Sequence, residues 1–229
     1  GSGTNAAQIA SQSLFALQHR GVEGAGIVTT DGGSLRAVRR PGMVRDVFNE
    51  PEIQALPGST AVGHNRYSTN GGRDAHLQPV VNASIGFALA HNGNIPDTDE
   101  LERYPRRRRY VTDRYNDSEL VGNTLASKLH GGRDFENALR ETAELAVGAY
   151  ACTATHGGIL AGFRDPHGIR PLEIGQLDGG LVLASETCAL DMIGAEYVRS
   201  VNPGELVQIA NGKLVSATQF AEPSEHSDV

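Results

Sequence analysis

Short runs of apolar and β-branched residues alternate with glycine along most of this chain, which has 229 residues including 28 glycines. Short apolar runs separated by glycine, aspartate or asparagine are typical of strands joined by tight turns. The pattern therefore predicts many short strands. They are expected over residues 26–30, 35–39, 59–64, 85–91, 149–155, 158–164, 172–177, 181–185, 206–210 and 213–217.

Three glycine-containing turns are expected to close hairpins between neighbouring strands. Residues 31–33 and 178–180 read DGG, and residues 211–212 read NG. Aspartate, asparagine and glycine tolerate the positive φ that tight hairpin turns require. These turns favour antiparallel pairing of the strands on either side.

Apolar positions three and four residues apart predict helices over residues 5–18, 117–129 and 135–145. Asn116 or Asp117 is expected to cap the second helix, because short polar side chains accept hydrogen bonds from the first turn. Two helices in the middle of the chain, with antiparallel strands before and after them, indicate a layered α+β domain.

The composition suits a globular protein, with 39% apolar and 21% charged residues. The net charge of −7 argues against nonspecific binding to nucleic acid. No apolar run reaches the roughly 18 to 20 residues that cross a bilayer, and no secretory signal is visible, so we expect a cytoplasmic protein without a membrane partner.

Cys152 and Cys188 lack metal-type spacing and are expected to be small buried residues. No metal site and no cofactor are expected.

Arg66 follows an apolar strand and precedes a glycine-rich stretch. A guanidinium group binds a carboxylate through two parallel hydrogen bonds, so this position suits capture of a carboxylate by a loop. An exposed arginine in an ordinary loop is the alternative that this segment leaves open.

Two more polar segments point to the same kind of ligand. Asn92-Gly93 is expected to form a sharp turn with positive φ, where a side-chain amide and a backbone N–H form an oxyanion hole. Asp117 suits a substrate ammonium group. A simple turn and a helix cap are the alternatives. Together with Arg66, these residues describe a site for an amino acid with a reactive carbonyl.

Five segments stand out along the chain. They read LQHRGVEGAGI at residues 17–27, GHNRYST at 63–69, AHNGN at 90–94, RDPHGIRPL at 164–172 and ASETCA at 184–189. In this order, they resemble the glutaminase domain of the amidophosphoribosyltransferase family, a class II glutamine amidotransferase. The order and spacing agree from about residue 5 to residue 214.

The resemblance implies an N-terminal-nucleophile hydrolase fold, a four-layer αββα sandwich of two antiparallel sheets. It also implies a glutaminase domain over residues 1–220 and a flexible tail over residues 221–229. In the family, an N-terminal cysteine attacks the glutamine amide, and its own α-amino group acts as the base. A thioester forms, ammonia leaves, and water then releases glutamate.

The resemblance also assigns roles to residues of this chain. Asn92 and Gly93 would stabilise the oxyanion. The substrate-binding residues would be Arg66 for the α-carboxylate, Asp117 for the α-ammonium, Tyr67 and Thr69 in the same loop, and Arg20 near the nucleophile. The histidines of these segments, His64, His91 and His167, are expected to be hydrogen-bonded structural residues.

The start of the sequence differs from the family pattern. It begins Gly1-Ser2-Gly3, and Asn5 already corresponds to the family's first helix, so the cysteine and the first strand are missing. Either residues are missing before Gly3, or the protein is a homologue that lost its nucleophile. The family's phosphoribosyltransferase domain is also absent from the sequence.

Two functions follow from these alternatives. With a native N-terminal cysteine, the protein would hydrolyse glutamine to glutamate and ammonia for an acceptor, as in purine biosynthesis. Its partners would then be a synthase or a phosphoribosyltransferase, or copies of itself. Without the cysteine, a pseudoenzyme would bind glutamine or a related amino acid, or a partner protein, in a specialised biosynthetic pathway.

The segment over residues 102–115 contains four adjacent arginines, Arg106, Arg107, Arg108 and Arg109. A run of like charges with little apolar content is typical of a solvated surface loop. A partner-docking or phosphate-binding role is the alternative.

Overall fold

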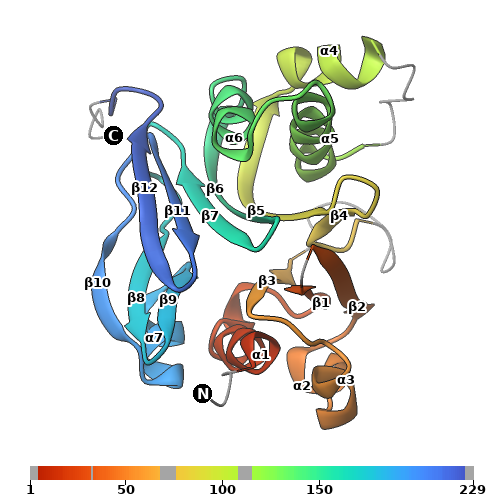
Figure 1. Cartoon of the computed structure of the whole chain (residues 1–229), viewed down its shortest axis with the longest axis vertical. Helices are drawn as coiled ribbons and strands as arrows, with labels where there is room; N and C mark the ends of the chain where they lie inside the picture. The colour runs from red at the N-terminus through yellow and green to blue at the C-terminus, as the bar shows by residue number, and fades with distance from the viewer. Residues whose placement is uncertain (1–4, 32, 68–75, 108–114, 225–229) are drawn as a thin grey trace.

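The computed structural model describes residues 5–31, 33–67, 76–107 and 115–224, with the backbone alone for residues 104–107 (Figure 1). Within these ranges, helices lie on the outside of two layers of antiparallel strands. No helix in the described ranges is long and apolar enough to cross a membrane.

The larger sheet has six antiparallel strands in the order β12-β11-β7-β6-β5-β4. The helices of the upper part of Figure 1 cover its outer face. The strands are β4 (Val80–Asn82), β5 (Phe87–Asp97), β6 (Val147–His156), β7 (Ile159–Arg164), β11 (Glu205–Ala210) and β12 (Lys213–Gln219), and the helices are α4 (Asp99–Arg107), α5 (Asp117–His130) and α6 (Phe135–Ala143).

The second strand layer consists of two three-stranded sheets, in the orders β2-β1-β3 and β10-β8-β9. Its strands are β1 (Gly24–Asp31), β2 (Ser34–Pro41), β3 (Thr60–Arg66), β8 (Glu173–Leu177), β9 (Gly180–Ala184) and β10 (Glu196–Ser200). The helices of this half are α1 (Ala6–Ala16), η1 (Gln18–Arg20), α2 (Val44–Val47), α3 (Glu50–Gln54) and α7 (Thr187–Ile193).

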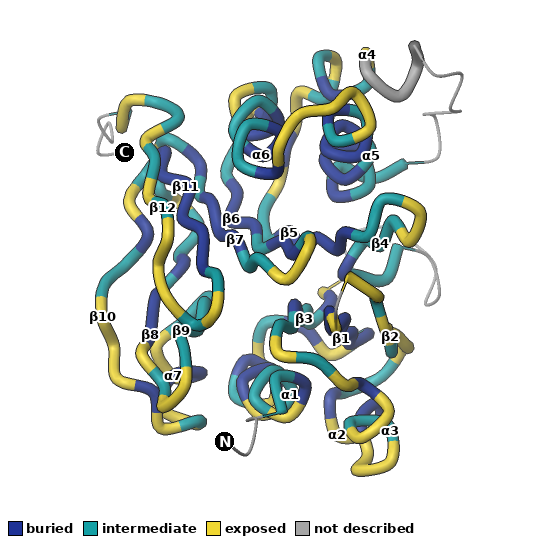
Figure 2. Tube along the Cα trace, viewed as in Figure 1, coloured by how far each residue is buried: buried dark blue, intermediate teal, exposed yellow. Residues whose placement is uncertain are grey.

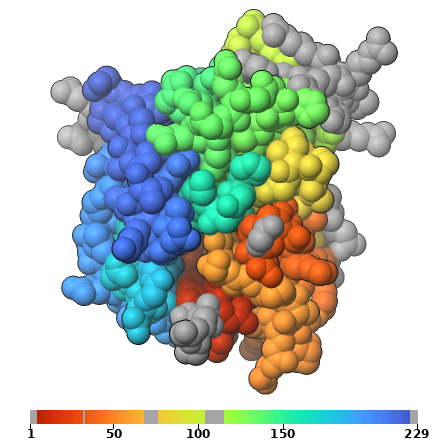
Figure 3. Space-filling model, in the orientation of Figure 1, coloured from red at the N-terminus to blue at the C-terminus, as the bar shows by residue number. Residues whose placement is uncertain are grey.

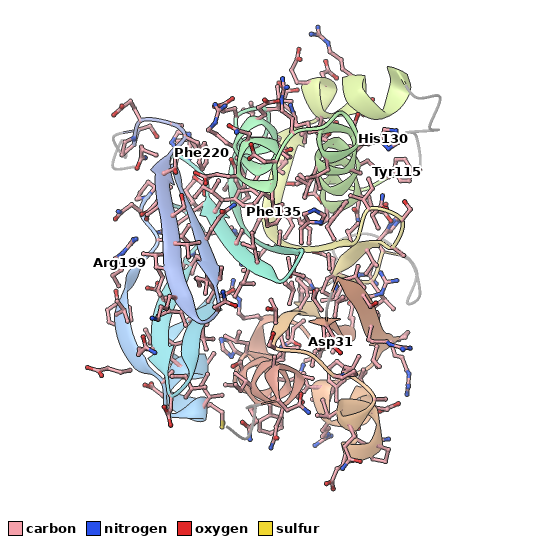
Figure 4. The ribbon with its side chains drawn as sticks, viewed as in Figure 1. Asp31, Tyr115, His130, Phe135, Arg199 and Phe220 are labelled. Carbon is pink, nitrogen blue, oxygen red and sulfur yellow. The ribbon has the colours of Figure 1, made fainter. Side chains whose placement is uncertain are left out.

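The largest apolar core lies between the six-stranded sheet and helices α5 and α6, where the strands and the inner helix faces are buried (Figure 2). Leu125, Leu139 and Tyr150 are fully buried in it, and the Tyr150 hydroxyl donates to the Ala143 carbonyl at 2.9 Å. At the start of α6, the ring of Phe135 points toward the sheet, where its centroid lies 5.4 Å from that of His156 (Figure 4). This core anchors β5 and β6.

Helix α5 begins where the sequence predicts it to begin, and its cap is Asn116. The Asn116 side chain accepts from the Glu119 backbone N–H at 2.9 Å, and the Glu119 carboxylate accepts from the Asn116 N–H at 3.1 Å. This reciprocal capping box satisfies two backbone donors at the helix start. Asp117 is therefore the first helical residue, and its carboxylate is not used as the cap.

All ten predicted strands and the three predicted hairpins are present. The sequence did not indicate β4, β10 or the short helices, because these elements are brief and partly exposed. The loop predicted over residues 102–115 is wrong for its first part: α4 extends to Arg107 because Leu101 is buried against α5, where Thr124 donates to its carbonyl. Arg106 and Arg107 belong to this helix, and Arg108 and Arg109 lie outside the described residues.

The predicted sandwich has two sheets, whereas the described residues form three. The reason is that β3 and β9 are both edge strands and do not pair with each other. Between them lies a groove of about 530 Å³, lined by α1 and by residues 59–63 and 180–185. In Figure 3 the cyan region that includes β9 lies beside the red N-terminal region.

We expect the Leu125→Ala variant to lose about 2 to 5 kcal/mol of unfolding free energy, because it leaves a cavity in the core beneath α5. Urea unfolding followed by circular dichroism measures the loss. Leu214→Ala, at an exposed position of β12, should stay within about 0.5 kcal/mol of the parent. Equal losses in the two variants would contradict this assignment of the core.

Candidate active site

Arg66 is the last residue of β3 and is buried, with 7% of its surface exposed. Its backbone carbonyl accepts from the Glu23 N–H at 3.2 Å. A side chain at Gly21 would lie 2.4 Å from the Arg66 carbonyl carbon, so the chain passes Arg66 closely there. The alternative of an exposed arginine in an ordinary loop is therefore wrong.

The residues that follow Arg66 differ in how they are placed. Tyr67 is 71% exposed. Thr69, the other residue expected in this loop, lies outside the described residues. The structure thus describes the start of the expected carboxylate-binding segment at Arg66 and Tyr67.

Asn92 and Gly93 lie inside strand β5, opposite Ala151 and Tyr150 of β6. The sharp turn predicted here is wrong, because β5 stays paired with β6 beyond His91 and runs to Asp97. The predicted positive φ is confirmed at Gly93, where φ is 148°. A side chain at Gly93 would lie 2.1 Å from the Ala149 carbonyl oxygen, so only glycine fits.

The side chain of Asn92 retains a hydrogen-bond donor. Its Nδ2 is buried and makes no hydrogen bond with any part of the chain that the structure describes. A buried donor without a protein partner is costly unless a ligand or water accepts from it. Such a donor suits a developing oxyanion.

The carboxylate of Asp117 faces the end of β5. It accepts from its own helix at the Ser118 N–H, at 2.8 Å, and from the Ile95 N–H of β5 at 3.4 Å. The His91 Nδ1 lies 3.9 Å from it and 2.9 Å from the Ser118 hydroxyl. One quarter of the Asp117 side-chain surface is exposed, so the carboxylate remains accessible to a ligand.

Two buried imidazoles connect these elements. The Nε2 of His64 lies 3.1 Å from the His91 carbonyl oxygen, which joins β3 to β5. Burial lowers the pKa of His64 to about 4, and the neighbouring His91 and Arg66 act in the same direction. Burial also lowers the pKa of His91, against the opposing influence of Asp117. Both rings are therefore neutral at neutral pH.

The expectation of hydrogen-bonded structural histidines is confirmed for His64 and His91, and the third histidine, His167, lies 2.5 Å from the Ser224 hydroxyl through its Nδ1. In the described ranges, no group of three or more histidine, cysteine, aspartate or glutamate residues is arranged to hold a metal ion.

Arg20 joins two segments that are far apart in the sequence. Its guanidinium donates to the Glu186 carboxylate of the α7 start, and the His19 Nε2 lies 2.9 Å from the same carboxylate. These hydrogen bonds connect the LQHRG segment to the ASETCA segment beside the groove. The contact makes Arg20 a link between η1 and α7; its predicted position near a nucleophile stays a prediction.

The two cysteines have different surroundings, and neither favours a thiolate. Cys152 is buried opposite His91, as expected, and burial raises its pKa well above the usual value. Cys188 is exposed, so its predicted burial is wrong; it lies in the first turn of α7, whose buried residues are Ala189 and Leu190. Partial burial and Glu186 raise the pKa of Cys188. A raised pKa reduces the reactive thiolate fraction.

Gln78 is a site residue that the sequence did not single out. Its side-chain amide forms two hydrogen bonds with the backbone of His91, the residue before Asn92. Its position before Pro79 marks it only as the start of a turn or strand. The contact could not be predicted from a local pattern, because its partner, His91, lies 13 positions further along the chain.

The sequence matches a family model described as "Glutamine amidotransferase domain" over residues 64–192. It is 38% identical over 228 residues to the amidophosphoribosyltransferase of Methanocaldococcus jannaschii, covering 98% of this chain and 48% of the relative. It is 40% identical over 228 residues to that of Synechococcus elongatus, covering 96% and 46%. The chain thus spans about half the length of these curated relatives.

The fold is similar to those of two solved structures, and the match again covers nearly all of this chain and about half of each of those chains. Glutamine phosphoribosylpyrophosphate amidotransferase from B. subtilis, complexed with ADP and GMP, superimposes with a TM-score of 0.84 at 34% identity, covering 95% of this chain and 47% of that one. A structure described as the allosteric regulatory enzyme of purine biosynthesis gives 0.83 at 35% identity, covering 94% and 46%. These matches confirm the predicted fold class.

We expect the buried His64 ring to make the protein less stable as the pH falls. Its pKa is about 4 in the folded protein and near 6.5 in the unfolded chain, so between these values the unfolded chain binds more protons. The unfolding free energy should decrease there by up to about 1.4 kcal/mol per pH unit, and this contribution should be constant above pH 6.5.

Urea unfolding at pH 7.5, 6 and 5 measures this dependence. His64→Gln should reduce its slope, whereas His130→Gln, at an exposed position at the end of α5, should leave it unchanged. An unchanged slope in the His64 variant would show that this ring is not the group that titrates.

Proposed function

We propose that this chain, which belongs to the glutamine amidotransferase domain family, binds glutamine and positions its side-chain amide for hydrolysis to glutamate and ammonia. The carboxylate of glutamine would lie on Arg66 and its ammonium group on Asp117. Asn92 and Gly93 would hold the amide oxygen. The products follow from attack on an amide carbon, departure of ammonia and addition of water.

One chain of hydrogen bonds carries this proposal. The His64 ring bonds to the His91 carbonyl, and the His91 ring bonds to the Ser118 hydroxyl. Arg66 is two residues beyond His64, Asn92 directly follows His91, and Asp117 directly precedes Ser118. The three groups proposed to bind an α-amino acid with a reactive amide thus belong to β3, β5 and α5, the elements that this connection joins.

The charges of the site suit a zwitterionic ligand. Arg66 is a buried cation, and Asp117 is a partly exposed carboxylate on a different element. Opposite charges on two elements are complementary to the carboxylate and the ammonium group of an α-amino acid. The neutral imidazoles of His64 and His91 add no further charge at neutral pH.

The oxyanion would form between Asn92 and Gly93. As the amide carbon becomes tetrahedral, its oxygen gains negative charge, and the buried Nδ2 of Asn92 can donate to it. This donor is already desolvated, so its interaction strengthens in the transition state without further reorganisation. Stabilisation of this kind raises kcat more than it lowers KM.

The attacking thiol is proposed to arrive on an extended segment in the groove between β3 and β9. Both strands present an edge to this groove, and β3 leads from the groove residues 60–63 to Arg66. An extended segment there would pair with both edges and merge the two small sheets. The raised pKa values of Cys152 and Cys188 argue against either as the nucleophile.

The acceptor of the ammonia is proposed from the relatives, which are named amidophosphoribosyltransferases. In a protein of their length, the ammonia would pass to a phosphoribosyltransferase domain, in purine biosynthesis and in the cytoplasm. This part of the proposal depends on the names of those relatives, and the glutamine site depends on the residues described above.

The carboxylate assignment predicts that Arg66→Lys binds glutamine about 10- to 100-fold more weakly, because lysine cannot form two parallel hydrogen bonds to a carboxylate. Isothermal titration calorimetry on this chain measures the dissociation constant. The matched control is Arg36→Lys, which makes the same change at an exposed position of β2 and should bind like the parent. Unchanged binding in both variants would rule out the carboxylate assignment.

The oxyanion assignment predicts that Asn92→Ala lowers kcat for glutamine hydrolysis by about 10²- to 10³-fold with little change in KM. The rate of glutamate release is measured on the natural protein with all of its residues. Asn94→Ala, two residues further along β5 and exposed, is the control and should retain its rate.

These measurements separate the two functions. Loss of rate only in the Asn92 variant would support the hydrolytic role. Glutamine binding that depends on Arg66, with no hydrolysis by the parent protein, would instead favour an amino-acid-binding homologue. Absence of both binding and hydrolysis would overturn the proposal.

A further inference from the structure

Gln78 forms a paired hydrogen bond with the backbone of His91. Its Oε1 accepts from the His91 N–H at 2.7 Å, and its Nε2 donates to the His91 carbonyl at 3.1 Å. One side-chain amide thus satisfies the donor and the acceptor of a single residue. This is the pattern with which one residue of an antiparallel strand satisfies its hydrogen-bonded partner.

The sheet register explains why a side chain takes this role. Val80 of β4 lies opposite Leu89 of β5, and the same register extended by two residues places Gln78 opposite His91. Pro79 lies between and has no N–H to donate, which favours the end of regular pairing there. The Gln78 side chain therefore continues the ladder where the backbone of β4 no longer does.

The backbone around Gln78 is held by the other strand layer. Arg39 of β2 donates to the Pro79 carbonyl at 2.9 Å and to the Leu77 carbonyl at 3.3 Å. A side chain at Gly26 would lie 2.1 Å from the Gln78 carbonyl oxygen, so β1 approaches this segment closely. The backbone around Gln78 is thus held by β1 and β2 of one strand layer, while the Gln78 side-chain amide bonds to β5 of the other layer.

The carbonyl of His91 receives a second donor from this same layer. The His64 Nε2 lies 3.1 Å from it, the same distance as the Gln78 Nε2. On its other side, His91 lies opposite Cys152 of β6. The N–H and the carbonyl of His91 are therefore both held from the β4 side, directly before Asn92 and Gly93.

We propose that Gln78 is a positioning residue that fixes the His91 peptide and thereby the place of the oxyanion-binding pair Asn92-Gly93. This inference rests on the proposed glutamine hydrolysis for its catalytic consequence, although the hydrogen bonds themselves can be tested without it. Gln78 would not touch the substrate. It would act on kcat through the backbone that carries the oxyanion donors, because small displacements of such groups cost large factors in rate.

Gln78→Glu is the informative substitution because it changes one atom of the amide. The carboxylate can still accept from the His91 N–H, but it cannot donate to the His91 carbonyl and faces that oxygen with negative charge. A protonated carboxyl group can donate again. Its ordinary pKa is about 4.3, and partial burial raises it, so donation should return as the pH decreases toward 5.

Other ionisable groups lie around this position in the parent and in the variant alike. They are His64 and Arg66 on β3, His91 on β5, Arg39 on β2, Asp117 and Glu119 on α5, and His76 beside Glu119. The ratio of variant to parent rates at each pH cancels the contributions that the two proteins share. The recovery predicted for Gln78→Glu is therefore a recovery of this ratio.

The kinetic test measures glutamine hydrolysis by the natural protein with all of its residues, between pH 5 and pH 8. We expect Gln78→Glu to lower kcat about 10-fold at pH 8, with KM within about 2-fold of the parent value. Near pH 5 the ratio of variant kcat to parent kcat should return most of the way to one. Gln78→Leu, which loses both hydrogen bonds, should lose at least as much and show no recovery at low pH.

Gln219→Glu is the matched control, because the Gln219 amide also donates to two backbone carbonyls, those of Pro203 and Ala221, away from the site. It should retain the parent kcat across the pH range. A Gln78→Glu variant with parent kcat at pH 8, or with a loss that stays constant down to pH 5, would overturn the positioning role.

A second measurement needs no hydrolysis. Hydrogen exchange followed by NMR on this chain should show the His91 amide exchanging at least about 10-fold faster in Gln78→Leu than in the parent, with the Leu125 amide in α5 unchanged. If the parent hydrolyses no glutamine, the proposed function fails, while a faster His91 exchange still supports the hydrogen bond. Unchanged exchange at His91 would overturn the inference whether or not the protein hydrolyses glutamine.

Discussion

The hydrogen bond between the His64 ring and the His91 carbonyl joins the two strand layers at the position of the proposed glutamine site. Burial lowers the pKa of His64 to about 4, so the ring that makes this bond is neutral at neutral pH. Arg66, Asn92 and Asp117 each lie within two residues of this bond or of its continuation to Ser118. The geometry of the site is therefore a consequence of how the layers are held together.

The apolar core beneath α5 and α6 gives this connection its rigidity. Tyr150 of β6 and Leu139 of α6 are both buried in this core, and β6 in turn pairs with β5 at Asn92 and Gly93, the proposed oxyanion pair. Because protein interiors pack as densely as crystals, β5 cannot shift without disturbing this core. The site depends on packing that lies outside it.

Local sequence patterns predicted the elements well and their contacts poorly. Glycine-marked turns located the hairpins of β1 with β2 and of β11 with β12, and Asn116 marked the start of α5. Asn92-Gly93 was predicted as a turn because its local residues suit one, whereas pairing with β6, a distant segment, keeps it in a strand. The Arg20–Glu186 contact joins residues 166 positions apart, which no local pattern can indicate. The Gln78–His91 pairing and the exposure of Cys188 depend on tertiary packing in the same way.

The groove between β3 and β9 also affects how molecules of this chain behave toward one another. Each edge presents backbone N–H and C=O groups without a strand partner in the described residues, on either side of an apolar lining. Natural proteins usually cover or charge such edges, because an uncovered edge pairs readily with any extended chain. A segment that pairs with these edges would therefore compete with strand pairing between copies of this chain.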